Sequence, residues 1–162
     1  QKSPSEVMHI EGPRQFSDRI ESLIRNHVQR DLEVDYRPDG YGRILPIPST
    51  LKELSGIVLV SQNGLDELDY NSNQYIDRDG VYSEQRLSSE DNFKKDDKLV
   101  LWHTHPSCNP TNSQDVRAFA ELISRFRTLD SKRCFDVRYI PKMDKFYWFG
   151  LKKKPLFKRI FQ

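Results

Sequence analysis

An apolar strand that ends in two histidines constrains this chain more than any other part of its sequence. Residues 98–102 (Lys-Leu-Val-Leu-Trp) form a short, largely apolar run, which is typical of a buried strand. Side chains two positions apart on a strand point to the same face, so His103 and His105 can converge on one ion. Pro106 cannot continue the strand pairing, so we expect the histidines at the strand end, where functional sites usually open.

Asp115 completes a three-ligand set for zinc. A hydrolytic zinc site needs three protein ligands and one open position for water. The two histidines supply neutral nitrogens, and Asp115, at the start of a helix expected over residues 113–127, supplies an anionic oxygen. A zinc ion held in this way activates water at neutral pH. Paired histidines also occur by chance, but the apolar strand, His-x-His-Pro, loop and helix-opening aspartate together predict a metal site and an enzyme.

The composition fits a soluble enzyme and argues against other classes of protein. A chain of 162 residues is long enough for one domain with a substantial core. Its formal net charge of +2 is too small to predict nucleic acid as the main partner. No apolar stretch approaches the roughly 20 residues that span a membrane. Two cysteines, Cys108 and Cys134, do not make a disulfide framework, so we expect a reducing, cytoplasmic setting.

Hydrophobic periodicity predicts the other elements. Residues 16–30 carry apolar side chains at helical spacing, with Ser17 as the expected N-cap. The β-branched run at residues 54–60 predicts a strand buried on both faces. An acidic, turn-rich segment with only weak strand signals follows at residues 64–97. The remaining expected elements are the strand at 98–102, the helix at 113–127 and a hairpin of strands at 134–140 and 145–151.

This order of elements indicates a single α/β domain with a mixed sheet over residues 16–151. We expect residues 1–15 to form an extended N-terminal arm. Residues 152–162 form a basic tail with interleaved apolar groups, for which a packing segment is the first interpretation and a membrane-surface or partner contact the second.

The residues around the histidines resemble the JAMM motif of the MPN/JAB zinc metalloproteases. In this family His-x-His-Pro is followed, at a fixed spacing, by a serine and then an aspartate, which His103-Thr104-His105-Pro106, Ser113 and Asp115 resemble. Outside the motif, the likeness extends over residues 16–151 only in the order of elements. The resemblance implies an MPN/JAB-like (cytidine-deaminase-like) fold, in which a mixed sheet is flanked by helices, with Zn²⁺ as cofactor.

The same resemblance implies a catalytic role for Glu53. The family's glutamate stands just before an apolar strand, typically as Glu-x-x-Gly followed by aliphatic residues. Glu53-Leu54-Ser55-Gly56 and the aliphatic run after it fit that context, so we expect Glu53 to be the general acid/base. Four other glutamates compete for this role, and none directly precedes a buried apolar strand: Glu33, Glu67, Glu84 and Glu90.

The chain departs from the motif at the expected oxyanion helper. Only Gln114 separates Ser113 from Asp115, where the family has two residues. Either Ser113 keeps the serine role with a rearranged turn, or Asn112 fills that position, since an amide can also donate to a developing oxyanion. We favour Ser113 because its spacing from His105 is intact.

The resemblance implies zinc-dependent hydrolysis of an amide or isopeptide bond, often at the C-terminus of ubiquitin or a ubiquitin-like protein. We therefore predict a deubiquitinase-like metallo-isopeptidase or processing protease that acts on such a substrate, with a possible partner from a conjugation pathway and no nucleic acid. Two alternatives stay open. One is a catalytically silent MPN scaffold for protein–protein interaction, and the other is a RadC-like, nucleic-acid-associated protein.

Overall fold

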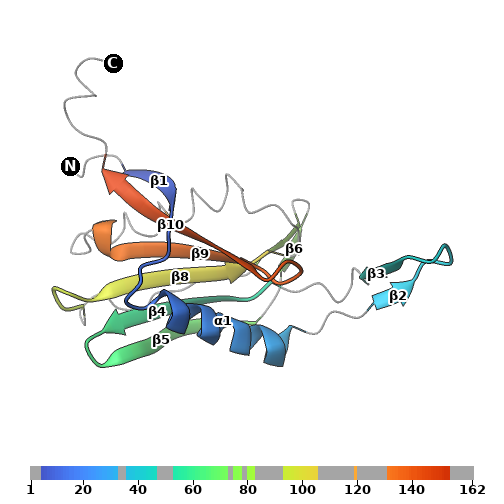
Figure 1. The fold of residues 1–162 in the computed structure, drawn as a ribbon, viewed down its shortest axis with the longest axis horizontal. Coiled ribbons are helices and arrows are strands. Elements are labelled where there is room, and N and C mark those ends of the chain that lie inside the picture. The colour runs from blue at the N-terminus through green and yellow to red at the C-terminus, as the bar shows by residue number, and fades with distance from the viewer. Residues whose placement is uncertain are drawn as a thin grey trace, which may run out of the picture.

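The centre of the protein is a six-stranded mixed β-sheet with a helix against one face (Figure 1). The structure, a computed structural model, describes residues 5–32, 36–46, 53–72, 75–77, 80–82, 93–105, 119 and 131–153. The elements are β1 (Ser5–Ile10), α1 (Ser17–Asp31), β2 (Tyr36–Pro38), β3 (Ile44–Pro46), β4 (Ser55–Ser61), β5 (Gly64–Asn71), β6 (Tyr75–Asp77), β7 (Gly80–Tyr82), β8 (Lys98–Thr104), a 3₁₀ turn (Ser131–Arg133), β9 (Cys134–Ile140) and β10 (Lys145–Lys153). The expected α/β class with a mixed sheet is confirmed.

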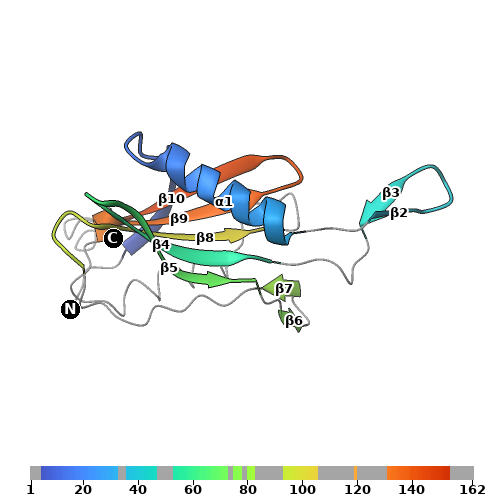
Figure 2. The same cartoon turned by 90° about the horizontal axis from the view of Figure 1, so that it is seen from below.

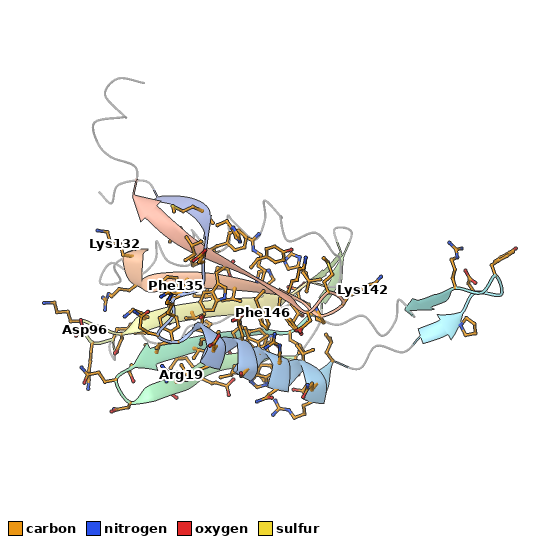
Figure 3. All side chains as sticks on the ribbon, in the orientation of Figure 1. Arg19, Asp96, Lys132, Phe135, Lys142 and Phe146 are labelled. Carbon is orange, nitrogen blue, oxygen red and sulfur yellow. The ribbon has the colours of Figure 1, made fainter. Side chains whose placement is uncertain are left out.

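The strand order of the sheet brings the ends of β8 and β9 together. The order is β1-β10-β9-β8-β4-β5, and the paired strands run antiparallel except β8 and β9, which are parallel. Because β8 and β9 run parallel, their C-terminal ends lie at the same end of the sheet. Lys142, in the turn after β9, marks this end in Figure 3, and Asp96 and Lys132 mark the opposite end.

Helix α1 covers one face of the sheet, as Figures 1 and 2 show from two sides. It buries Ile20, Ile24 and His27. The apolar core beneath it also draws on every second residue of the sheet strands, because alternate strand residues face the same side. This core consists of Phe16, Ile20, Ile24, Leu54, Val58, Val60, Val100, Trp102, Phe135, Val137, Tyr139 and Trp148.

The start of α1 differs from the sequence prediction. Ser17 is the first helical residue rather than the N-cap, a position that Phe16 occupies without a side-chain hydrogen bond. The carbonyl of Pro13 accepts the N–H groups of Phe16 and Ser17, at 3.2 and 2.8 Å. The preceding turn therefore satisfies two N–H groups at the start of the helix, and the side chain of Phe16 packs in the core.

The opposite face of the sheet has a second apolar cluster. Its buried members are Ile57, Leu99, Leu101, Phe119, Cys134 and Leu151. Phe119 is helical and 3 % exposed, and the rest of the helix expected over residues 113–127 lies outside the described residues. Among the residues that the structure describes, no helix combines the length and apolar character needed to cross a membrane.

Four of the predicted strands are confirmed as β4, β8, β9 and β10, and the hairpin that joins the last two is antiparallel as expected. The predicted N-terminal arm contains β1, which pairs with β10 and completes one end of the sheet. Strand β5 was missed by the sequence analysis. It pairs with β4 at the other end of the strand order and carries the acidic residues Asp66, Glu67 and Asp69.

Gly56 allows Trp102 to lie directly against β4. A Cβ atom at Gly56 would stand 2.4 Å from Nε1 of Trp102, whose side chain is fully buried. We therefore expect Gly56→Ala to lower the free energy of unfolding by about 1–3 kcal/mol, as overpacking of a filled core does. Urea denaturation followed by circular dichroism measures this change.

The matched control is Gly150→Ala, also in a sheet strand. A Cβ atom there would meet Cδ1 of Ile10 at 3.4 Å, an ordinary contact. This variant is expected to unfold close to the wild-type midpoint. Equal losses at the two glycines would mean that strand conformation, and not the contact with Trp102, explains the effect.

Candidate metal centre

The alternation of β8 directs the two histidines to the face of the sheet opposite α1. Val100 and Trp102 belong to the core beneath the helix, whereas Leu99 and Leu101 belong to the second cluster. His103 continues the second series at the C-terminal end of the strand. His105 lies one residue beyond the strand, and its N–H donates to the carbonyl of Tyr139 at 2.8 Å. Both histidines are thus held at the sheet end, as the sequence predicted.

The imidazole rings of His103 and His105 face each other with their Nε2 atoms. Nε2 of His103 and Nε2 of His105 lie 2.9 Å apart, and the ring centroids are 4.8 Å apart. Each residue is 8 % exposed. Two nitrogens bound to one tetrahedral zinc at about 2.0–2.1 Å lie roughly 3.3–3.4 Å apart. The observed separation is about 0.4–0.5 Å shorter than that value, so a small movement of the two rings apart would bring both nitrogens to binding distance of one zinc ion.

The register of β4 and β8 places Glu53 on the segment next to His105, and hydrogen bonds to Thr104 hold the start of β4. The N–H of Leu54 donates to the Thr104 hydroxyl, and the N–H of Thr104 donates to the Leu54 carbonyl, both at 2.9 Å. Ser55 pairs with His103 in the adjoining register. Continuing this antiparallel register by two residues along each segment sets Glu53 across from His105. Glu53 is 9 % exposed, so the carboxyl group predicted to be catalytic is largely shielded from solvent.

Asp136 is a member of this group that the sequence analysis missed. Its Oδ1 lies 3.8 Å from Nδ1 of His103, and its Oδ2 lies 3.4 Å from Nε of Arg138. Asp136 and Arg138 are 2 % and 1 % exposed. A signal was present in the sequence, since these two charged residues alternate within the otherwise apolar strand β9. Residues at that spacing share one face, which here is the face of the histidines.

Tyr139 links the candidate centre to the opposite side of the sheet. Its carbonyl holds His105, while its hydroxyl donates to Oδ1 of Asp144 at 2.8 Å. Arg25 of α1 donates to the same carboxylate at 3.0 Å. Burial, together with the Asp144 contact, raises the pKa of Tyr139 to about 12, and the Tyr139 and Arg25 hydrogen bonds lower the pKa of Asp144. The turn after β9 is therefore joined to α1 by the hydrogen bond between Arg25 and Asp144.

His27 is a buried histidine of the other face. Its ring stacks on Tyr70 at a centroid distance of 3.9 Å and also stacks on Trp102. Its Nε2 contacts Oε1 of Glu67, and its Nδ1 contacts Arg30. His27 is therefore a packed core histidine, and Glu67 lies with it on the side of α1.

Three predicted site residues lie outside the described residues: Ser113, Asn112 and Asp115. The third zinc ligand and the oxyanion helper therefore stay predictions. Within the described parts of the chain, no group of three or more His, Cys, Asp or Glu side chains gathers as a metal site would require. The described part of the centre is the pair His103 and His105, with Glu53 and Asp136 on either side.

Comparisons of this chain with models of known protein families, with curated proteins and with solved structures found no match.

The Thr104 hydrogen bonds make a specific prediction about stability. Thr104→Val keeps the shape of the side chain but removes the acceptor for the buried N–H of Leu54. An unsatisfied buried donor costs about 1–3 kcal/mol, so we expect a loss of that size in the free energy of unfolding. Thr104→Ser retains the hydroxyl and should lose less in the same urea titration. A valine variant as stable as the serine variant would contradict this role of the Thr104 hydroxyl.

Proposed function

We propose that this chain is a zinc-dependent metallo-isopeptidase or peptidase of the JAMM type. The observation that carries the proposal is the convergence of the Nε2 atoms of His103 and His105 at a buried sheet end, with Glu53 set across from them. The MPN/JAB fold belongs to the same proposal. It is supported by the mixed sheet, by α1 on one face and by the helical Phe119 on the other.

The donor set suits a hydrolytic zinc rather than a structural one. His103 and His105 would hold the ion together with Asp115, which leaves one position open, as catalytic zinc sites do. When bound, zinc supplies a Lewis acid that polarises the scissile carbonyl and lowers the pKa of water. Structural zinc sites, by contrast, fill all four positions with protein ligands.

The side chains around the ion divide the remaining chemistry. Glu53 takes the proton of the attacking water and delivers it to the leaving amine, so that one water is consumed for each amide bond cleaved. Ser113, or Asn112 in its place, donates a hydrogen bond to the oxyanion of the tetrahedral intermediate. Burial of Glu53 and of both histidines keeps bulk water from competing with these contacts.

The proposed substrate is an amide or isopeptide bond that follows the C-terminus of ubiquitin or a ubiquitin-like protein. This assignment rests on the resemblance of the motif residues to the JAMM family. No acyl-enzyme intermediate forms in this mechanism, because water is the nucleophile. Cysteine- and serine-directed reagents should therefore leave the activity intact, whereas chelators should abolish it.

The test combines metal analysis with an activity assay of the purified chain. We expect about one zinc per chain by elemental mass spectrometry. We also expect cleavage of a fluorogenic amide at the C-terminus of ubiquitin or a ubiquitin-like protein that 1,10-phenanthroline stops and added Zn²⁺ restores. Zinc without cleavage of any such fusion would favour the silent scaffold. A chain that binds no zinc would overturn the proposal.

A further inference from the structure

We propose that Asp136 is a positioning residue that sets the tautomer of His103 and thereby directs its Nε2 lone pair to the metal. This inference rests on the proposed zinc centre. It concerns a group that would not touch the metal or the substrate, and it assigns a role to the buried Asp136–Arg138 pair.

The first observation is the arrangement of the two ring nitrogens of His103. Its Nε2 faces Nε2 of His105 at 2.9 Å, while its Nδ1 faces Oδ1 of Asp136 at 3.8 Å. The carboxylate and the metal position thus lie at different nitrogens of one imidazole. The 3.8 Å separation is about 1 Å longer than a hydrogen bond, so Asp136 acts on Nδ1 as a nearby buried charge. Asp136 is 2 % exposed, so little solvent screens its charge from the ring.

The second observation is that Arg138 fixes the orientation of the carboxylate. Nε of Arg138 lies 3.4 Å from Oδ2 of Asp136, and Cζ of Arg138 lies 4.0 Å from the ring centroid of Phe149. A guanidinium group can only donate, so the atom of Asp136 that faces it must be an acceptor. With Oδ2 turned toward Arg138, Oδ1 is the oxygen that faces Nδ1 of His103.

The consequence follows from the proton count of a neutral imidazole. A neutral histidine carries one N–H, and the carboxylate favours that proton on Nδ1, which leaves Nε2 as a lone pair. Metal-binding histidines commonly donate their second nitrogen to a carboxylate in this manner, and the contact raises their basicity. In the metal-free protein, the facing Nε2 atoms then share the proton of His105, which donates to His103.

Asp136→Asn reverses this preference without changing the size of the side chain. Arg138 still requires an acceptor, so the amide oxygen stays with Arg138 and the amide NH₂ turns toward His103. Nδ1 of His103 must then accept, its proton moves to Nε2, and the metal lone pair is lost. Replacement of such a partner typically weakens metal affinity about 10–100-fold.

The control variant is Asp97→Asn, at the opposite end of β8. Asp97 is also a buried carboxylate, 6 % exposed, and its Oδ2 accepts the N–H of Lys94 at 2.8 Å. It therefore reports what the loss of a buried carboxylate does to the fold alone. Circular dichroism and urea titration of both variants show whether they remain folded.

Two measurements test the role. The first is the affinity for Zn²⁺ in competition with a chromophoric chelator, for wild type, Asp136→Asn and Asp97→Asn. We expect a loss of about 10–100-fold only for Asp136→Asn. The second is the tautomer of His103 in the metal-free protein, read from imidazole ¹⁵N chemical shifts. We expect the proton on Nδ1 in wild type and on Nε2 in Asp136→Asn.

The two measurements separate this inference from the proposed function. A wild type that binds no zinc overturns the enzyme proposal, yet the shift of the proton between the two nitrogens would still support the role of Asp136. A wild type that binds zinc, with unchanged affinity in Asp136→Asn, overturns the inference alone. A wild-type His103 protonated on Nε2 overturns it as well, and this result needs no variant.

Discussion

Replacing His103 or His105 with alanine is expected to abolish zinc binding and hydrolysis together. The Nε2 atoms of His103 and His105 lie 2.9 Å apart, and the proposed zinc position lies at these two atoms. Loss of either one leaves two of the three proposed ligands, one histidine and Asp115, and a catalytic zinc site needs three. Replacing a residue that hydrogen-bonds a metal ligand weakens metal affinity by about 10–100-fold. Loss of a ligand itself should weaken the affinity for Zn²⁺ by more than this. Equilibrium dialysis with elemental analysis measures the bound metal.

His27→Ala provides a matched control for this experiment. His27 is 7 % exposed, close to the 8 % of the two site histidines, but it belongs to the core under α1. This variant loses a buried imidazole and its stacking partners, so its stability should fall while its zinc content stays at the wild-type level. Zinc retained in both His103→Ala and His105→Ala would show that the metal position lies elsewhere.

The sequence predicted the strands that carry this site because their composition leaves few alternatives. Strand β8 is apolar up to its histidines, and β4 is apolar and β-branched, so each reads as a strand buried on both faces. The shared orientation of His103 and His105 can be predicted from the two-residue alternation of a strand alone. The pairing of β8 with β9 cannot be predicted in this way, because parallel neighbours are joined by a long crossover and the local sequence does not identify the partner strand.

Strand β5 escaped prediction for two physical reasons. It stands at the end of the strand order, so its charged residues can point to solvent. The register with β4 also shifts by a residue, since Ile57 pairs with Asp69 but Val58 pairs with Glu67. This bulge at Leu68 breaks the alternation on which strand prediction depends.

Asp136 was missed for a related reason. Its alternation with Arg138 was visible in the sequence, but the partner that gives it meaning is His103 on the neighbouring strand. That proximity follows from the parallel register of β8 and β9. Leu101 lies opposite Asp136 and His103 lies opposite Arg138, so Asp136 and His103 are diagonal neighbours on one face. A charged residue in an apolar strand therefore signals a buried polar group, and only the topology tells which site it serves.

Glu53→Gln is expected to separate catalysis from metal binding. The substitution preserves the size of the side chain and its place at the start of β4, but an amide cannot take a proton from water. We expect kcat to fall by about 10²–10⁴-fold, the usual contribution of general acid–base catalysis. Zinc content and KM should stay near the wild-type values, since Glu53 is not one of the proposed ligands. Steady-state kinetics with the ubiquitin-like fusion measures both constants.

Glu67→Gln is the control that makes this result specific to Glu53. Glu67 was a competing candidate from the sequence, and it contacts His27 on the face that α1 covers. The topology thus sets the two carboxyl groups on opposite sides of the sheet, and only Glu53 shares a side with the converging histidines. A loss of kcat in Glu67→Gln equal to that in Glu53→Gln would argue for a general structural effect. A fully active, zinc-loaded Glu53→Gln enzyme would show that Glu53 is not the general acid/base of the reaction.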